Sequence, residues 1–364
     1  MASSSLLHSD YIIASLLCIL INNNRAITCT SIVSDVYRDL LSSRLLQRQI
    51  QQQQIVNSSS LTLNATSTTN EDVLVKSTSM LLLVQVLFRH GDRSPTKLYP
   101  TNIHKNDWPH GLGQLTQVGM MQSYQLGLYL RDQYKDFLEK NYNRNEVYIR
   151  STNYDRTLMT AECVASGLFP LNNNQEDNLT SSWPVGTWQP IPVQTVPGDI
   201  DRVLHPSKSC KYIHDLEKVQ ADLHSNRLNL TIETELFLKL SQYTGMDINR
   251  TNIHSLANTF FCEKVHNLSL PVWVTPELEE ILLNYAGQRS KVSPETAKYL
   301  SGTLLHTLVT NMLRKTDNQS DLRKMYLYSA HDTTVSELLS LLEVDDQIQV
   351  PYTAAVIIEL HRIQ

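Results

Sequence analysis

Residues 86–95 read Val-Leu-Phe-Arg-His-Gly-Asp-Arg-Ser-Pro, so one histidine, His90, stands between Arg89 and Arg93. The block follows an uncharged apolar run, Met80 to Phe88, which is typical of a buried strand in a parallel sheet. Ligands of open α/β sheets bind at the carboxyl ends of such strands. Two guanidinium groups this close to an imidazole indicate a shared anion, and phosphate matches their geometry best. The imidazole is then a candidate nucleophile toward phosphorus.

A competing interpretation treats Arg89 and Arg93 as solvated surface charges and His90 as a hydrogen-bonded loop histidine. Against it, Gly91 and Pro95 predict a tight turn that holds the three side chains together. A motif this short also needs partners elsewhere in the chain before it carries weight.

Two further stretches have the same form, a β-prone run followed directly by a helical pattern. Residues 146–157 read Glu-Val-Tyr-Ile-Arg-Ser-Thr-Asn-Tyr-Asp-Arg-Thr, which places Arg156 near the first turn of a helix. The strand predicted at 325–330 ends at His331 and Asp332, where another apolar helical pattern begins. Three predicted strands therefore end in charged or titratable residues, as a site that processes an anion requires.

Each of these residues also has a purely structural interpretation. Asp332 precedes a helix, where Asp is a favoured cap, and Thr334 with Glu337 fits a capping box. Arg156 is compatible with a solvated helix start, although the helix dipole favours acidic residues there. His331 is compatible with a buried, hydrogen-bonded histidine. The agreement of three separate motifs favours the functional interpretation.

Taken together, the three blocks resemble the histidine acid phosphatases, and the animal branch with the prostatic, lysosomal and testicular enzymes is most similar. The resemblance covers about residues 80 to 364, and it includes shorter stretches at 113–117, 188–193 and 262–267. It implies an α/β fold in which a central, mostly parallel sheet is flanked by helices, as in phosphoglycerate mutase. A smaller α-helical insert is implied as well.

The resemblance also implies a role for each matching residue. His90 attacks a phosphate monoester and becomes a phosphohistidine, and Asp332 donates a proton to the leaving alcohol. The phosphoryl oxygens are bound by three arginines and a second histidine: Arg89, Arg93, Arg156 and His331. No metal or other cofactor is implied. A carboxyl group must be protonated to act as the acid, so an acid phosphatase with an acidic pH optimum is expected.

Other functions stay open at this point. The same fold serves relatives of phosphoglycerate mutase, specialised phytases and lysophosphatidate phosphatases. A catalytically silent secreted glycoprotein that binds ligands is a further alternative. The intact set of candidate residues favours an enzyme, and Asp332 favours hydrolysis over a mutase reaction. Small phosphomonoesters are therefore the expected substrates, and a homodimer is one option because similar enzymes are commonly dimers.

The chain outside these motifs divides by composition. Residues 1–28 predict a secretory signal peptide, because 11–21 is mostly apolar yet too short to span a bilayer comfortably. No Lys or Arg precedes this run, so an uncleaved segment or signal anchor is the alternative. Residues 29–79 predict a disordered polar linker or pro-segment rich in Gln, Ser, Thr and Asn. The remainder is expected to form a discontinuous α/β phosphatase domain and an α-helical cap domain: residues 80–184 with 296–364, and residues 185–295.

One helix of the α/β part has a clear start signal. Thr116 is a good N-cap, and apolar residues follow at helical spacing over 114–140. These positions are Val118, Met121, Tyr124, Leu128 and Leu138.

Charge and sequons bear on partners and location. A net charge of −5 and a pI near 6.2 give no basic surplus for nucleic acid. Asn-x-Ser/Thr sequons, which beside a signal peptide indicate N-glycosylation, occur at seven positions: Asn57, Asn64, Asn178, Asn229, Asn249, Asn267 and Asn318. A secreted or lysosomal protein is therefore expected.

The five cysteines are too few for a disulfide scaffold. Cys210 and Cys262 match positions that are bridged in the resembling branch, so a disulfide bond is implied. One expected partner position corresponds to Ala355, and the other would lie beyond Gln364. A bond between Cys210 and Cys262 is left open by the sequence.

Overall fold

The computed structural model describes the chain in segments, the first two by their backbone alone: residues 12–22, 25–32, 79–170, 189–209, 211–213, 215, 230–288, 292–317, 321–344 and 350–363. In these segments, no helix is both long and apolar enough to cross a lipid bilayer.

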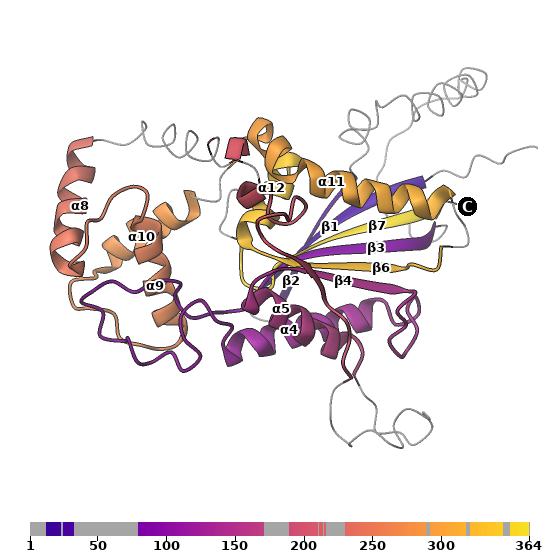
Figure 1. Cartoon of the computed structure of the whole chain (residues 1–364), viewed down its shortest axis with the longest axis horizontal. Helices are drawn as coiled ribbons and strands as arrows, with labels where there is room; N and C mark the ends of the chain where they lie inside the picture. The colour runs from indigo at the N-terminus through magenta and orange to yellow at the C-terminus, as the bar shows by residue number, and fades with distance from the viewer. Residues whose placement is uncertain are drawn as a thin grey trace, which may run out of the picture.

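A seven-stranded sheet forms the centre of the molecule, with the order β2-β1-β7-β3-β6-β4-β5 (Figure 1). The strands are β1 (Ile12–Asn22), β2 (Arg25–Ile32), β3 (Ser79–Arg89), β4 (Val147–Thr152), β5 (Gln194–Val196), β6 (Met325–Ala330) and β7 (Ala355–Ile363). Neighbouring strands from β3 through β6 and β4 to β5 are parallel, whereas β7, β1 and β2 are joined by antiparallel pairing. The α/β prediction is confirmed, and the parallel arrangement holds on one side of the sheet.

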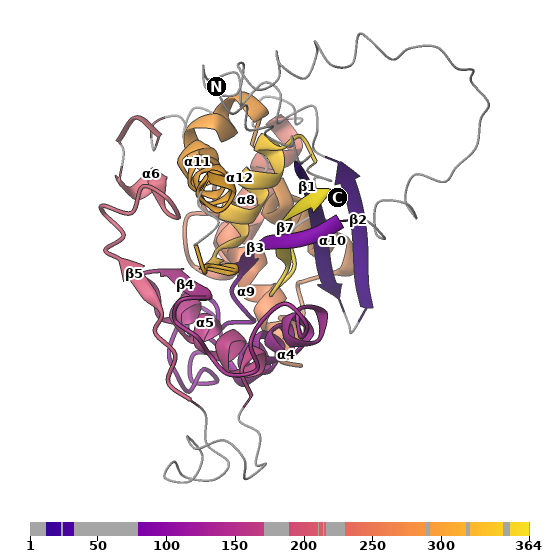
Figure 2. The ribbon, with the colours of Figure 1, turned by 90° about the vertical axis from the view of Figure 1, so that its right-hand side faces the viewer.

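Two pairs of helices cover the two faces of the sheet (Figures 1 and 2). They are α4 (Gln117–Gln133) with α5 (Asp155–Leu168) on one face, and α11 (Pro294–Asp317) with α12 (Asp332–Leu341) on the other. Along β3, Val84, Val86 and Phe88 pack on the α4 and α5 side. The alternate residues Leu83 and Leu87 pack on the α11 and α12 side. Burial on both faces explains why this strand is a continuous apolar run.

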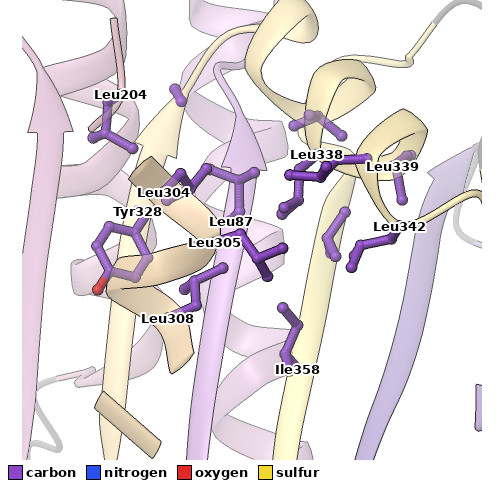
Figure 3. Close-up of a cluster of buried hydrophobic side chains, with 14 of the residues drawn as sticks. Leu87, Leu204, Leu304, Leu305, Leu308, Tyr328, Leu338, Leu339, Leu342 and Ile358 are labelled. Atoms are coloured by element: carbon purple, nitrogen blue, oxygen red, sulfur yellow. The ribbon is translucent and has the colours of Figure 1, made fainter. Parts of the chain in front are cut away.

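The cluster under α11 and α12 shows how the second face is filled (Figure 3). Leu87 and Tyr328 point from the sheet toward Leu304 and Leu308 of α11, and Leu338 of α12 completes the layer. Because α12 starts directly after β6, this packing also fixes the strand end where the predicted site lies.

Helix α4 begins as predicted, since the Thr116 side chain accepts a hydrogen bond from the backbone N–H of Gly119. Its predicted apolar stripe, however, is largely not the buried face: Val118, Met121 and Leu128 are exposed. The buried side is formed mainly by small residues and two leucines: Gly119, Ser123, Leu126, Gly127 and Leu130.

Close approach of α4 to α5 explains this choice of face. A Cβ atom on Gly127 would lie 2.2 Å from the backbone oxygen of Val164, and one on Gly167 would lie 2.2 Å from that of Tyr124. The two helices therefore touch backbone to backbone, and side chains of any size are excluded from the contact.

We expect Gly127→Ala to destabilise the protein by about 1–3 kcal/mol, because the added methyl group forces the two helices apart. Gly302 in α11 is the matched control, since a Cβ there meets no atom within 4 Å. Gly302→Ala should stabilise the protein by about 0.5–1 kcal/mol through helix propensity. Urea denaturation followed by circular dichroism measures both, and equal effects of the two changes would contradict the packing argument.

The insert predicted at 185–295 is mainly helical in its described part, but it also contains β5, which pairs with β4 in the central sheet. Its helices are α6 (Pro206–Ser209), α8 (Leu230–Thr244), α9 (Ile253–Val265) and α10 (Pro276–Gln288). The last three lie together beyond one end of the sheet (Figure 1). They share a separate apolar cluster that includes Leu240, Leu256, Phe260 and Leu282.

The apolar N-terminal run has a place in the sheet. Strand β1 pairs with β7 from Ile12↔Arg362 to Ile19↔Ala355, and β2 pairs with β1. Of the predicted signal peptide, residues 12–22 and 25–28 extend the sheet beyond β7, and residues 1–11 and 23–24 lie outside the described part. The predicted linker is described only through Ile32 and again from Ser79, and residues 33–78 lie outside the described part.

Candidate active site

The three predicted strand ends meet at one edge of the sheet. In the parallel pair β3 and β6, Arg89 is in register with Ala330, and the backbone N–H of His90 donates to the Ala330 oxygen at 3.0 Å. The residues that follow, His90 and His331, therefore lie side by side, with ring centroids 5.6 Å apart. Strand β4 lies on the other side of β6 and leads into α5, whose first turn holds Arg156.

A cavity of about 540 Å³ opens at this edge. Five of the six predicted residues line it: His90, Arg93, Arg156, His331 and Asp332. Its other walls come from the segment after Arg93, from residues 204–207 and from α9. This volume is well within the range of small-molecule sites.

Arg89 lies behind the cavity and does not line it. The side chain is fully buried, donates to the backbone oxygen of Val350, and lies 4.1 Å from the centroid of the Tyr352 ring. Its Nη2 is 3.2 Å from Oδ2 of Asp332. Arg89 thus contributes positive charge to the site and holds the carboxylate at the cavity wall.

One ring nitrogen of His90 is engaged in a hydrogen bond to the backbone. Its Nδ1 lies 2.8 Å from the backbone oxygen of Gly91, so this nitrogen carries the proton and donates. In the neutral ring, Nε2 then keeps its lone pair. Burial lowers the pKa of His90 well below its usual value, and nearby positive charge lowers it further, from Arg89, Arg156, His331 and Arg93. The lowered pKa favours the neutral imidazole, which is the form that a nucleophile requires.

His331 and Arg156 are linked to each other and to the end of β4. Nε2 of His331 lies 3.0 Å from Oγ1 of Thr152, and Nδ1 lies 3.4 Å from Nη2 of Arg156. Burial is the main cause that lowers the pKa of His331, followed by the charge of Arg156. Burial also lowers the pKa of Arg156 to about 10, with Arg93 as the next cause. Arg156 therefore stays cationic at acidic and neutral pH.

The arginines keep donors that no protein group satisfies. In the described part of the chain, the buried Nε atoms of Arg89, Arg93 and Arg156 have no hydrogen-bond partner. Buried donors are normally paired. The positive charge of Arg93 and Arg156, which line the cavity, suits a tetrahedral oxyanion.

Asp332 is the first residue of α12, and the N-cap residue is His331, whose side chain makes no capping bond. The predicted capping box is therefore wrong, because Thr334 already lies inside the helix. Oδ1 of Asp332 accepts from the backbone N–H of Thr333 at 3.0 Å, and a third of the side chain stays exposed. The carboxyl group thus borders both Arg89 and the cavity.

Gly91 serves close packing in addition to the predicted turn. A Cβ atom there would lie 2.3 Å from the Gly119 oxygen, and one on Gly119 would lie 2.1 Å from the Asp92 oxygen. The backbone N–H of Gly91 also donates to Oγ1 of Thr160. The loop that carries His90 therefore rests directly on the first turn of α4.

Comparison with known proteins identifies this arrangement. Residues 80–363 match the model of the histidine phosphatase superfamily (branch 2). The chain belongs to this family. It is 39% identical over 294 residues to lysosomal acid phosphatase of Xenopus laevis, a match that covers 78% of this chain and 66% of the relative. It is also 39% identical over 296 residues to human prostatic acid phosphatase, covering 77% and 74% of the two chains.

Solved structures agree on the fold of this histidine phosphatase. The phytase of Hafnia alvei superposes with a TM-score of 0.55 at 19% identity, covering 78% of this chain and 81% of that one. A multiple inositol polyphosphate phosphatase of Bifidobacterium longum gives a TM-score of 0.53 at 10% identity, with 82% and 86% covered. The chain spans about two thirds of the length of the lysosomal relative and three quarters of the prostatic one.

The expected disulfide is not formed at Cys262, which is a buried free thiol. Its Sγ lies 3.8 Å from the Tyr352 hydroxyl and 4.0 Å from Nη1 of Arg93. Ala355 is the first residue of β7 and offers no sulfur for a bond. Cys210 lies outside the described residues.

Several residues of the site were missed by the sequence analysis. Tyr352 lies against Arg89 and 5.9 Å from the His90 ring, between centroids. Tyr154 packs edge-on against His331 at 5.0 Å and lies 4.7 Å from the Arg156 guanidinium. Tyr154 precedes Arg156 by two residues, so its place at the same strand end was available as a signal. Tyr352 lies in a loop with no such pattern.

Replacing Arg156 with Met should shift the acid limb of kcat/KM to higher pH. The change removes one of the charges that lower the His90 pKa, so this pKa rises and less of the imidazole is neutral at low pH. The measurement is the pH profile of phosphate monoester hydrolysis with one substrate for all variants. Lys97→Met is the control, because Lys97 lines the same cavity yet is not a cause of the His90 shift. An acid limb that stays in place in Arg156→Met would contradict this electrostatic account.

Proposed function

We propose that this histidine phosphatase is an acid phosphatase, which hydrolyses small phosphate monoesters through a phosphohistidine on His90. One observation carries the proposal: a neutral, buried imidazole with a free Nε2 lies beside Arg93, Arg156 and His331 in one cavity, with Asp332 at its wall. The names of the relatives, lysosomal and prostatic acid phosphatase, support it.

The first chemical step forms a bond between Nε2 of His90 and phosphorus. The bond from phosphorus to the ester oxygen breaks, and this oxygen takes a proton from the carboxyl group of Asp332 as the alcohol leaves. Arg93, Arg156 and His331 bind the equatorial oxygens, where charge is spread in the transition state. Arg89 acts from behind, because it holds Asp332 and adds positive charge.

The second step regenerates the enzyme. Water attacks the phosphorus of the phosphohistidine, the nitrogen–phosphorus bond breaks, and inorganic phosphate forms. The carboxylate left by the first step takes the proton from the attacking water, so Asp332 returns to its acid form. The chemistry uses only groups that line or border the cavity.

The location of the protein is part of the proposal. A signal peptide in residues 1–28 would direct the chain to the secretory route, and the sequons would then carry N-linked glycans. Among the sequons in described segments, Asn267 is exposed at the end of α9 and is available to a glycan. The lysosomal and prostatic relatives support a lysosomal or secreted protein. The helices α8, α9 and α10, which share one apolar cluster, are here called the cap, and α9 is the one that lines the cavity.

His90→Ala should lower turnover by at least about a thousandfold, because no other group replaces the covalent nucleophile. Rapid quench with a ³²P-labelled monoester should trap an acid-labile label on the wild-type protein and none on this variant. His306→Ala, a change at an exposed histidine of α11, should keep the label. Near-normal turnover in His90→Ala would eliminate the covalent route.

Asp332→Asn should slow esters of poor leaving groups far more than p-nitrophenyl phosphate, whose leaving group needs little protonation. A positioned acid contributes about a hundredfold to ten-thousandfold, so the loss on an alkyl phosphate should exceed the loss on p-nitrophenyl phosphate by about a hundredfold. The asparagine keeps an oxygen acceptor for Arg89 and Thr333. Equal losses on both esters, read from kcat/KM, would remove the acid role.

A further inference from the structure

Helix α9 belongs to the cap, yet one of its faces contacts the loop that carries the nucleophile. Asn258, Cys262 and His266 are four residues apart, so they lie along one side of the helix and its C-terminal cap. All three contact Asp92 or Arg93, the residues that follow His90 and Gly91. The cap is therefore joined to the catalytic loop over two turns of helix.

The contacts at the two ends of this face are strong hydrogen bonds. Oδ1 of Asn258 accepts from Nη1 of Arg93 at 2.9 Å. Nε2 of His266 lies 2.6 Å from Oδ2 of Asp92, which is completely buried. Cys262 lies between them, with Sγ 4.0 Å from the same Nη1 atom of Arg93. His266 and Cys262 thus fix where α9 lies on the loop, and Asn258 is left facing the arginine.

Arg93 depends on few groups for its orientation. Its Nη1 donates to the backbone oxygen of Ser94 at 3.0 Å and to Asn258. Its Nε has no protein partner although it is buried. Because a guanidinium group is planar, two acceptors on one terminal nitrogen fix the plane and the direction of the remaining donors. Without Asn258, the Ser94 oxygen and the weak sulfur acceptor of Cys262 would be left to orient this end of the side chain.

We propose that Asn258 is a positioning residue that aims Arg93 at the phosphoryl group, and that the cap thereby sets the affinity of the site for phosphate. The inference rests on the proposed role of Arg93 as a phosphate ligand. The positioning residue lies in α9 of the cap, whereas the predicted phosphate ligands lie at the edge of the sheet.

The test compares Asn258→Ala and Asn258→Leu with the wild-type full chain. Alanine favours the helix, and leucine fills the space so that water cannot replace the lost acceptor. The Kd of inorganic phosphate, measured by calorimetry, and the KM of p-nitrophenyl phosphate should rise by about tenfold in Asn258→Leu, as expected for the loss of a hydrogen bond to a charged group. A loss of folded protein alone would lower the apparent kcat and leave both constants unchanged.

Asn252→Leu is the matched control. Asn252 lines the same cavity at the start of α9, and its hydrogen bonds are to the backbone of Asp247 and Asn249. The variant removes local structure without touching Arg93, so the Kd of phosphate should change by less than about twofold.

A double-mutant cycle shows whether Asn258 acts through Arg93. In an Arg93→Met background, Asn258→Leu should change the Kd of phosphate by less than about twofold, since the group it positions is gone. An unchanged Kd in Asn258→Leu alone, or a full tenfold effect in the Arg93→Met background, would overturn the inference. A wild-type protein that hydrolyses no monoester would instead contradict the proposed function, whichever result the phosphate titrations give.

Discussion

The parallel register of β3 against β6 is the constraint on which the site depends. Pairing of Arg89 with Ala330 brings the two strands to their ends at the same level, so His90 and His331 leave the sheet together. A shift of one residue would turn alternate side chains to the opposite face. The apolar residues on both faces of β3 prevent such a shift, because each face has its own helix layer to fill. The core thus determines the distance between the two histidines.

The charges gathered at this edge oppose one another. Burial and mutual repulsion lower the pKa values of His90, His331 and Arg156, so the folded protein favours the uncharged imidazoles. Among these groups, Asp332 supplies a carboxylate, and Arg89 lies against it. An oxyanion in the cavity would balance the remaining positive charge. The negative charge of the substrate would therefore complement the positive charge of the site.

Local sequence predicted the elements whose signals are local. The apolar runs that became β3 and β6 end at charged residues, and both the strands and their shared edge follow from that pattern. The face of α4 was misjudged because apolar spacing was taken as the buried stripe, whereas Gly127 and its neighbours are buried by backbone contact with α5. The capping box at Thr334 failed because the N-cap of α12 is His331, three residues before Thr334.

Contacts between distant segments had no such signal. The approach of Asn258 to Arg93 spans 165 residues, and no spacing rule links the two positions. Likewise, the place of Tyr352 beside Arg89 depends on how the loop before β7 folds over the sheet. The catalytic motifs could be read from the sequence, whereas the groups that orient their side chains required the fold.

The contact between Gly91 and Gly119 affects how rigidly the backbone holds His90, the proposed nucleophile. Main chain against main chain leaves no rotamers at the junction, so thermal motion there cannot be absorbed by a side-chain flip. The His90 imidazole, one residue away, is therefore attached to a rigid backbone contact. It needs little reorganisation as charge shifts during the reaction. A larger residue in place of either glycine would disrupt this backbone contact, even though neither glycine carries a functional group.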